Sequence, residues 1–284
     1  MDVITSVQQM KLFSARARAT NKRIAFVPTM GFLHEGHLSL MREGKKRGDV
    51  LVVSVFVNPT QFGPSEDFER YPRDFARDSR MAEEVGVDVF FAPEPKEMYP
   101  PNHQSFIRVT DVTRGLCGKS RPTHFQGVAT VVGMLFNIVR PHVALFGEKD
   151  FQQLVTIQQM VRDLHMDAEV VGMPIVRESD GLAMSSRNTY LNADERKAAL
   201  SLHRSLERAR ESISRGEFGA GVLAKEVTEV IQSEPLVRVD YVEVCDARTL
   251  KPVDRIDRDT VIAVAAYIGK VRLIDNFVYR IART

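Results

Sequence analysis

Apolar residues in the first part of the chain occur as short continuous runs and do not alternate with polar residues. These runs are Ile24–Val27, Val50–Val57, Val87–Ala92, Val143–Phe146 and Val170–Val176. Segments with helical periodicity separate them, near residues 4–19, 37–47, 74–85, 127–139 and 150–165. Strands buried on both faces have such continuous runs, and alternating strands and helices are typical of a doubly wound parallel sheet. The pattern predicts an α/β domain over residues 1–176.

The pattern changes at about residue 177. Asn192 is a suitable N-cap for a long helix that ends near Ser214, and a second helix is expected over residues 220–233. Three strand-like segments then follow, at Val237–Val244, Val261–Tyr267 and Val271–Val278. Two helices followed by a small antiparallel sheet predict a second, smaller α+β domain over residues 177–284.

Composition narrows the class of protein. A chain of 284 residues is long enough for two domains, and its formal net charge of +2 provides no basic surface that would favour nucleic acid. Its 2 cysteines, Cys117 and Cys245, cannot form a disulfide framework, which fits a reducing compartment. The sequence has no signal-peptide pattern and no apolar run near the roughly 20 residues that span a bilayer. We therefore expect a cytoplasmic protein without a membrane segment.

The segment Pro28–His37 carries the strongest chemical signal. It joins a predicted strand to a predicted helix, and His34 and His37 share one face of the helix start. Backbone N–H groups and the helix dipole attract phosphate there, and Gly31 and Gly36 allow the backbone to bend. Two histidines without a third ligand nearby are weak evidence for a zinc site. The alternative is that both histidines are ordinary polar residues at a helix start. The segment resembles the HxGH signature of the nucleotidyl-transferring α/β superfamily, which includes class I aminoacyl-tRNA synthetases.

Two other polar clusters follow predicted strands, at the edge of the sheet where such folds bind ligands. The amides of Asn58 and Gln61 suit a hydroxyl-bearing or carboxylate ligand, although a simple polar strand exit is the default alternative. Gly147 permits a tight turn, and Lys149 can reach a phosphate. Gln153 lies one turn after Lys149 and is expected to face the same cleft. A capped helix with a solvated lysine is the alternative for this second cluster.

Two further segments complete the candidate site, and a third is excluded. Gly63–Asp74 is rich in charge, glycine and proline, which predicts a mobile loop or lid. Met184–Asn188 offers two hydroxyls and a guanidinium to a triphosphate, and it resembles the KMSKS loop of class I synthetases. Gly118-Lys119-Ser120 resembles the end of a P-loop, but Thr113 stands where the P-loop needs its first glycine.

Taken in order, PTMGFLHEGH, VNPTQF, RPTHFQGV, LFGEKDFQQ and MSSRN resemble the pantothenate synthetase family over nearly the whole chain. That resemblance implies an ATP-dependent ligase of pantothenate biosynthesis. Such enzymes join pantoate to β-alanine with Mg²⁺, pass through a pantoyl adenylate and release AMP and pyrophosphate. It further implies a homodimer whose Rossmann-like N-terminal domain binds ATP and pantoate and whose smaller C-terminal domain covers the site.

The resemblance also assigns roles to residues by position. Gln61 and Gln153 would hold pantoate, Gln61 would also receive β-alanine, and Asn58 is grouped with them for its amide. His37 is at the family's general-acid position. The other residues that would stabilise the developing charge are His34, Lys149, Ser185, Ser186 and Arg187. The ATP-binding positions would be Met30, Gly31, His34, Gly36, His37, Gly147, Glu148, Lys149, Asp150, Val176, Met184, Ser185, Ser186 and Arg187. No protein ligand for a metal is predicted.

One position departs from the family pattern, and two other functions compete with this one. Thr123 stands where the family usually has glycine, and its Cβ leaves the geometry of that turn open without changing the family assignment. A nucleotidyltransferase that leaves the nucleotide on its product would share the histidine and Ser-Ser-Arg chemistry. A nucleotide sensor or tRNA-binding module would bind ATP without turnover, and tRNA would need a basic surface.

Overall fold

The computed structural model describes residues 1–64 and 66–281, which divide into two compact units. The first unit contains residues 1–110, 121–148 and 156–174. The second contains residues 111–120 and 149–155 together with the chain from Ile175 onward. Ser65 lies outside the described residues.

A six-stranded parallel sheet forms the centre of the first unit, with strand order β1-β4-β3-β2-β5-β6. Its strands are β1 (Asp2–Ile4), β2 (Ile24–Thr29), β3 (Val50–Val55), β4 (Val89–Phe91), β5 (Val143–Gly147) and β6 (Glu169–Met173). The five strands predicted from apolar runs are confirmed. The helix pattern over 4–19 was wrong at its start, because Ile4 belongs to the edge strand β1, whose three residues are too short to show a pattern.

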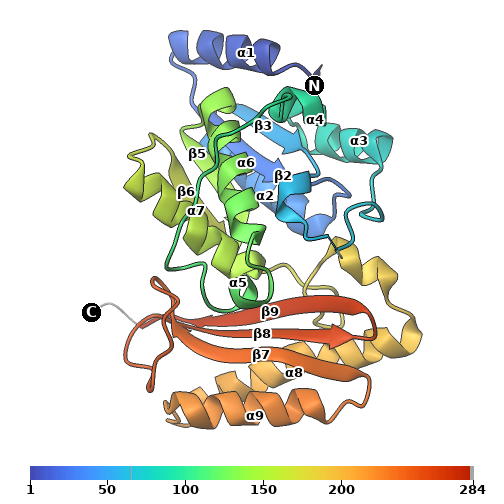
Figure 1. The fold of residues 1–284 in the computed structure, drawn as a ribbon, viewed down its shortest axis with the longest axis vertical. Helices are drawn as coiled ribbons and strands as arrows, with labels where there is room; N and C mark the ends of the chain where they lie inside the picture. The colour runs from blue at the N-terminus through green and yellow to red at the C-terminus, as the bar shows by residue number, and fades with distance from the viewer. Residues whose placement is uncertain (65, 282–284) are drawn as a thin grey trace. The chain divides into compact units, whose positions relative to one another are not determined.

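Helices cover both faces of this sheet (Figure 1). Those of the first unit are α1 (Val7–Ala19), α2 (Glu35–Arg47), α3 (Phe75–Val85), α4 (Pro95–Met98) and α6 (His124–Val139), and α7 (Phe151–Asp163) continues from the second unit into it. Leu40 and Met41 of α2 and Ala82 of α3 pack with β-strand residues in one buried cluster. On the other face, Phe136 of α6 meets Phe26 of β2 edge to face, with ring centroids 6.3 Å apart. These layers confirm the predicted doubly wound architecture.

The order in which the chain adds strands to the sheet reverses after β4, and the switch point lies between the neighbouring strands β2 and β5. Strands β2, β3 and β4 are added in one direction, and the chain then returns to place β5 against the free side of β2. Ligands of open α/β sheets bind beyond the carboxyl ends of the strands at such a switch point. The segments after β2 and β5 are the ones that carry the histidines and the Gly147-Glu148 turn.

The second unit is built on an antiparallel sheet with strand order β7-β8-β9. Its main elements are α5 (Cys117–Ser120), η3 (Ser186–Tyr190), α8 (Ala193–Ser214), α9 (Ala220–Gln232), β7 (Val237–Asp246), β8 (Thr260–Ile268) and β9 (Val271–Tyr279). Leu202 and Leu206 of α8 and Leu223 of α9 pack with the sheet in one buried cluster. Asn192 caps α8 as predicted, since its Oδ1 accepts from the Glu195 backbone N–H at 2.9 Å. The predicted α+β organisation is confirmed.

No helix within the described part of the chain is long and apolar enough to cross a bilayer.

Candidate active site

The two histidines of the Pro28–His37 segment cap helix α2. His34 is the N-cap residue, and its Nδ1 accepts a hydrogen bond from the Gly36 backbone N–H at 3.2 Å. His37 Nδ1 accepts from the His34 backbone N–H at 3.3 Å, and the two ring centroids lie 4.1 Å apart. An accepting ring nitrogen carries no hydrogen, so each neutral ring holds its proton on Nε2. The reciprocal cap therefore places two Nε2–H donors at the positive end of the helix dipole.

A buried carboxylate shapes the turn before these histidines. Gly31 (φ 83°) and Phe32 (φ 51°) have left-handed backbone. Asp78 of α3, 1% exposed, accepts from the backbone N–H groups of Phe32 at 2.7 Å and Leu33 at 2.8 Å. Burial raises the pKa of Asp78 above its ordinary value, although these two hydrogen bonds act in the opposite direction. The bend expected at Gly36 was wrong, since that residue lies in the first turn of α2.

The amides after β3 form a closed network with the histidine segment. Gln61 Nε2 donates to Met30 Sδ at 3.1 Å, and Asn58 Nδ2 donates to Gln61 Oε1 at 3.0 Å. Asn58 is 1% exposed, and its Oδ1 accepts from the hydroxyls of Thr60 at 3.0 Å and Tyr99 at 2.8 Å. Burial raises the pKa of the Tyr99 phenol, so it stays protonated as a donor. The structure thus brings Met30, Asn58 and Gln61 together, with Asn58 holding Gln61 in place.

Helix α6 supports the other side of Gln61. Gly127 lies so close to η1 (Pro59–Gln61) that a Cβ there would stand 2.5 Å from the Thr60 carbonyl oxygen. His124 Nδ1 donates to the Gln61 carbonyl at 2.8 Å. Thr123 precedes α6 with φ −97°, a conformation open to any residue. This turn does not need left-handed backbone, so the Cβ of Thr123 causes no such strain here.

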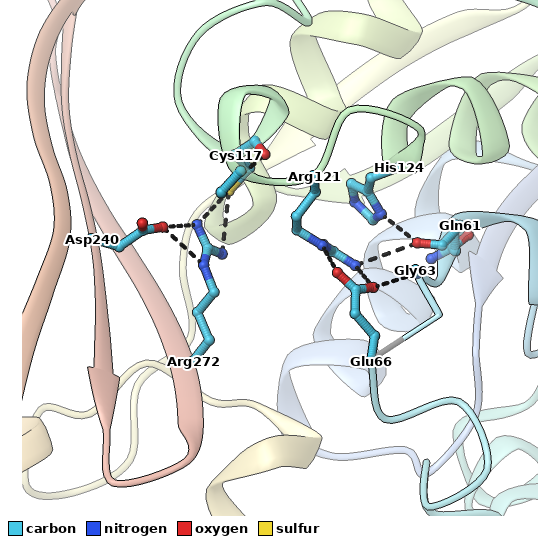
Figure 2. A network of polar contacts seen from close by, with 9 residues as sticks. Gln61, Gly63, Glu66, Cys117, Arg121, His124, Asp240 and Arg272 are labelled. Carbon is cyan, nitrogen blue, oxygen red and sulfur yellow. Dashed lines mark hydrogen bonds and ion pairs between the residues drawn. The ribbon is translucent and has the colours of Figure 1, made fainter.

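The loop predicted as a lid is tied to the same helix end. Arg121 donates from Nε and Nη2 to the two carboxylate oxygens of Glu66, each at 2.6 Å, and from Nη2 to the Gln61 carbonyl at 3.4 Å (Figure 2). Burial, the largest influence, would raise the pKa of Glu66, but the Arg121 hydrogen bonds and charge outweigh it and lower that pKa. The mobility of Gly63–Asp74 stays a prediction.

Gly147, at the end of β5, has open space around the position that a Cβ would occupy. Within the described chain, a Cβ on Gly147 would meet no atom within 4 Å, so packing does not demand glycine there. Glu148 follows in η2 (Glu148–Asp150), where Lys149 Nζ lies 3.8 Å from Asp150 Oδ2. Open space beside a strand end suits the close approach of a ligand to the backbone.

In the second unit, a tight hairpin precedes the Ser-Ser-Arg segment. The Met184 backbone N–H donates to the Val176 carbonyl at 3.0 Å, and Arg177 pairs with Ala183. Ser185 is the N-cap of η3, and its hydroxyl accepts from the Arg187 backbone N–H at 3.2 Å. The hairpin thus fixes the conformation of the short segment Met184–Arg187. Lys149, Asp150 and the half-buried Gln153 also belong to the second compact unit of the chain.

A second polar network in this unit contains none of the candidate residues. Arg272 donates to Asp240 Oδ2 from Nε at 3.0 Å and from Nη2 at 2.7 Å, and its two Nη atoms lie 3.5 Å from Cys117 Sγ (Figure 2). Among residues 1–64 and 66–281, no group of three or more His, Cys, Asp or Glu is arranged to hold a metal ion.

Comparison with known proteins gives one consistent result. The model of the pantoate-beta-alanine ligase family matches residues 2–278. The pantothenate synthetase of Syntrophus aciditrophicus is 57% identical over 98% of each chain, and that of Thermotoga petrophila is 53% identical over 97% of this chain and 99% of its own. The crystal structure of pantothenate synthetase from Thermus thermophilus is similar with a TM-score of 0.93 at 43% identity, covering 98% of this chain and 99% of that one.

A second solved structure adds ligands. The pantoate-beta-alanine ligase of Francisella tularensis, described as complexed with beta-gamma ATP and beta-alanine, is 33% identical with a TM-score of 0.78. The alignment covers 98% of this chain and 97% of that one.

Proposed function

Since the chain belongs to the pantoate–β-alanine ligase family, we propose that it condenses pantoate with β-alanine and splits ATP into AMP and pyrophosphate. The observation that carries this proposal is the family match over residues 2–278. The rival nucleotidyltransferase and the non-catalytic sensor do not fit a ligase family.

The reaction proceeds in two displacements. A pantoate carboxylate oxygen attacks the α-phosphorus of ATP, the bond to the β-phosphate oxygen breaks, and pyrophosphate leaves. The β-alanine amine then attacks the carbonyl carbon of pantoyl adenylate. An amide bond forms, the amine releases a proton, and AMP departs with the electrons of the broken C–O bond. Neither displacement uses a nucleophile from the protein.

The candidate residues fall into groups according to the substrate that each would contact. His34 and His37 direct Nε2–H donors from the start of α2 toward the triphosphate, where preorganised donors stabilise charge that develops on the leaving group. Lys149 and the hydroxyls and guanidinium of Ser185, Ser186 and Arg187 act on the same phosphates. Met30, Gly31, Gly36, Gly147, Glu148, Asp150, Val176 and Met184 complete the ATP-binding positions. Gln61 and Gln153 hold pantoate, and Asn58 holds Gln61.

We propose that Mg²⁺ arrives bound to ATP. Magnesium in phosphoryl-transfer sites commonly uses phosphate oxygens and water with only one or two carboxylates. This fits a chain whose described residues include no cluster of three or more acidic, His or Cys side chains arranged for a metal. The metal would neutralise phosphate charge beside Lys149.

The assembly and location also stay proposals. We propose a cytoplasmic homodimer in which residues 177–284 form a lid over the ATP- and pantoate-binding part at residues 1–176. Both cysteines are free and buried in the second unit, which is compatible with a reducing compartment.

Product analysis tests the function directly. The protein is incubated with MgATP, pantoate and β-alanine, and the products are identified by liquid chromatography with mass spectrometry. Equimolar AMP, pyrophosphate and pantothenate are expected, with no pantothenate when either organic substrate is omitted. A product that retains the nucleotide would support the rival enzyme, and ATP binding without any turnover would support the sensor.

A further inference from the structure

Two adjacent polar side chains are buried in strand β9. Asp275 is 3% exposed and Asn276 is 4% exposed, and they pair in register with Val264 and Ala263 of β8. A buried carboxylate and a buried amide cost free energy unless each finds hydrogen-bond partners. The partners of these two residues therefore indicate why the strand contains them.

Asp275 is paired with the base of the hairpin that leads to the Ser-Ser-Arg segment. Its two carboxylate oxygens accept from Arg177 Nη1 at 2.7 Å and Nη2 at 3.0 Å, a bidentate ion pair. Arg177 Nη1 also donates to the Gly181 carbonyl at 3.0 Å, across the hairpin turn. Because Arg177 lies beside Val176 and opposite Ala183, this ion pair fixes the hairpin immediately before Met184.

Asn276 is bonded to the other ATP segment. Its Nδ2 donates to the Lys149 carbonyl at 3.0 Å. Its backbone N–H donates to Asp275 Oδ1 at 2.8 Å, so the two side chains are part of one network. All of these residues belong to the second unit. One dipeptide of β9 thus contacts the Lys149 backbone and Arg177, whose hairpin leads to the Met184–Arg187 segment.

We propose that Asp275 and Asn276 are positioning residues that fix the Lys149 segment and the Met184–Arg187 segment in one mutual arrangement. The inference rests on the proposed function of these segments. Neither residue is proposed to contact the substrate. They act by holding the backbone at Lys149 and the hairpin at Arg177, so that the ammonium, hydroxyl and guanidinium groups converge on one triphosphate. Misplacement of such groups reduces both nucleotide binding and rate.

The experiment measures Asn276→Ala and Asp275→Asn in the full-length enzyme. Pyrophosphate release is followed while MgATP, pantoate and β-alanine are varied in turn. Asn276→Ala removes the hydrogen bond to the Lys149 carbonyl, so KM for ATP is expected to rise about tenfold, while KM for pantoate changes less than twofold. Asp275→Asn is expected to raise KM for ATP more strongly than Asn276→Ala does, because it also disturbs Arg177. ATP binding by calorimetry should weaken in parallel.

A matched control comes from the same sheet. Asp240→Asn breaks the Arg272 ion pair between β7 and β9, which contacts neither ATP segment. It should lower Tm without changing KM for ATP.

Unchanged KM for ATP in Asn276→Ala, with kcat reduced only in proportion to the folded fraction, would overturn the positioning role. If the unaltered chain makes no pantothenate, the proposed function fails instead. If Asp275→Asn does not fold, Asn276→Ala and the charge-keeping Arg177→Lys decide, and Arg177→Lys is expected to raise KM for ATP.

Discussion

We propose that His34 serves two purposes through its two ring nitrogens. Nδ1 completes the cap of α2, and the tautomer that this requires places the proton on Nε2, the atom proposed to act on phosphate. A residue that only capped the helix could be replaced by asparagine, one of the best N-caps. Asparagine has no donor at the position of Nε2, so this exchange separates the structural purpose from the chemical one.

We expect His34→Asn to keep the fold and lose activity. The free energy of unfolding should change by less than about 1 kcal/mol because the cap is retained, while kcat falls by ~10²–10³ through the loss of one preorganised donor. Denaturant unfolding and steady-state pyrophosphate release measure the two quantities. His37→Ala, which removes cap and donor together, is the comparison. Near-normal kcat in His34→Asn would remove this ring from the charge stabilisation.

Cys245 gives a prediction for alkaline pH. Burial first, and then the Glu243 carboxylate, raise the pKa of its thiol from 9.0 to about 12. Between these values the unfolded chain loses the proton and the folded chain keeps it. The folded state is therefore fully stabilised below pH 9 and loses stability as pH rises toward 12, with a slope of up to about 1.4 kcal/mol per pH unit. Urea unfolding across pH 8–11 measures this slope, and Cys245→Ala should show a shallower one.

Single residues differ in how well the sequence revealed them. His34, His37 and Gln61 could be selected because they follow strands and carry donors at meaningful spacing. Asp78 was missed because it acts through tertiary contacts to Phe32 and Leu33, far away in sequence. A signal did exist, since Asp78 stands four residues before Ala82 and shares with it the buried face of the predicted helix. Arg121 and Glu66 gave no such signal, since neither interrupts an apolar pattern.

At the scale of elements, the apolar pattern determined most boundaries. Strand β5 and helix α9 were predicted to within one or two residues because burial governs both. Strand β1 and the one-turn helices were missed, because three or four residues cannot show a period. The apolar pattern also could not predict the strand order, because tertiary packing decides that β5 pairs with β2. That pairing brings the two strand ends that we propose to face phosphate to one switch point.

The packing of α6 against η1 yields a prediction at this scale. Gly127→Ala would place a methyl group 2.5 Å from the Thr60 carbonyl oxygen, so η1 must move. We expect a loss of about 1–3 kcal/mol in stability and a higher KM for pantoate, because Gln61 moves with η1, while KM for ATP stays nearly constant. Gly221→Ala in α9 is the control, since a Cβ there meets nothing within 4 Å in the described chain. Equal changes in both KM values would contradict the assignment of Gln61 to pantoate.

At the scale of the whole molecule, each of the two units carries its own set of candidate residues. The first unit supplies the histidine cap and the supported Gln61 amide. The second supplies Lys149 and the Ser-Ser-Arg segment, linked by β9. The proposed reaction uses none of these groups as a covalent nucleophile, so the chain would instead hold an activated acyl group as a bound adenylate. Both cysteines are buried, and neither is a candidate residue.

A bound adenylate predicts an order of events. ATP and pantoate alone should yield about one pyrophosphate per active site, because the first displacement needs no amine and the adenylate stays bound. The acyl carbon then occupies the position that the pantoate carboxylate held beside Gln61, so β-alanine must approach at the same amide. Water must be kept out meanwhile, since it would hydrolyse the mixed anhydride. We expect the Gly63–Asp74 loop, attached through Glu66 to Arg121, to contribute to that exclusion.

Rapid-quench measurement of pyrophosphate decides this order. A burst close to one equivalent without β-alanine, followed by slow release, is the expected result, and addition of β-alanine should convert the adenylate to pantothenate in a single turnover. Glu66→Gln keeps the size of the side chain but weakens its attachment to Arg121. It should keep the burst and raise the slow release that follows, because water then reaches the adenylate. If no burst appears although both substrates are bound, the amine must bind before the first displacement, and the two-step order is wrong for this chain.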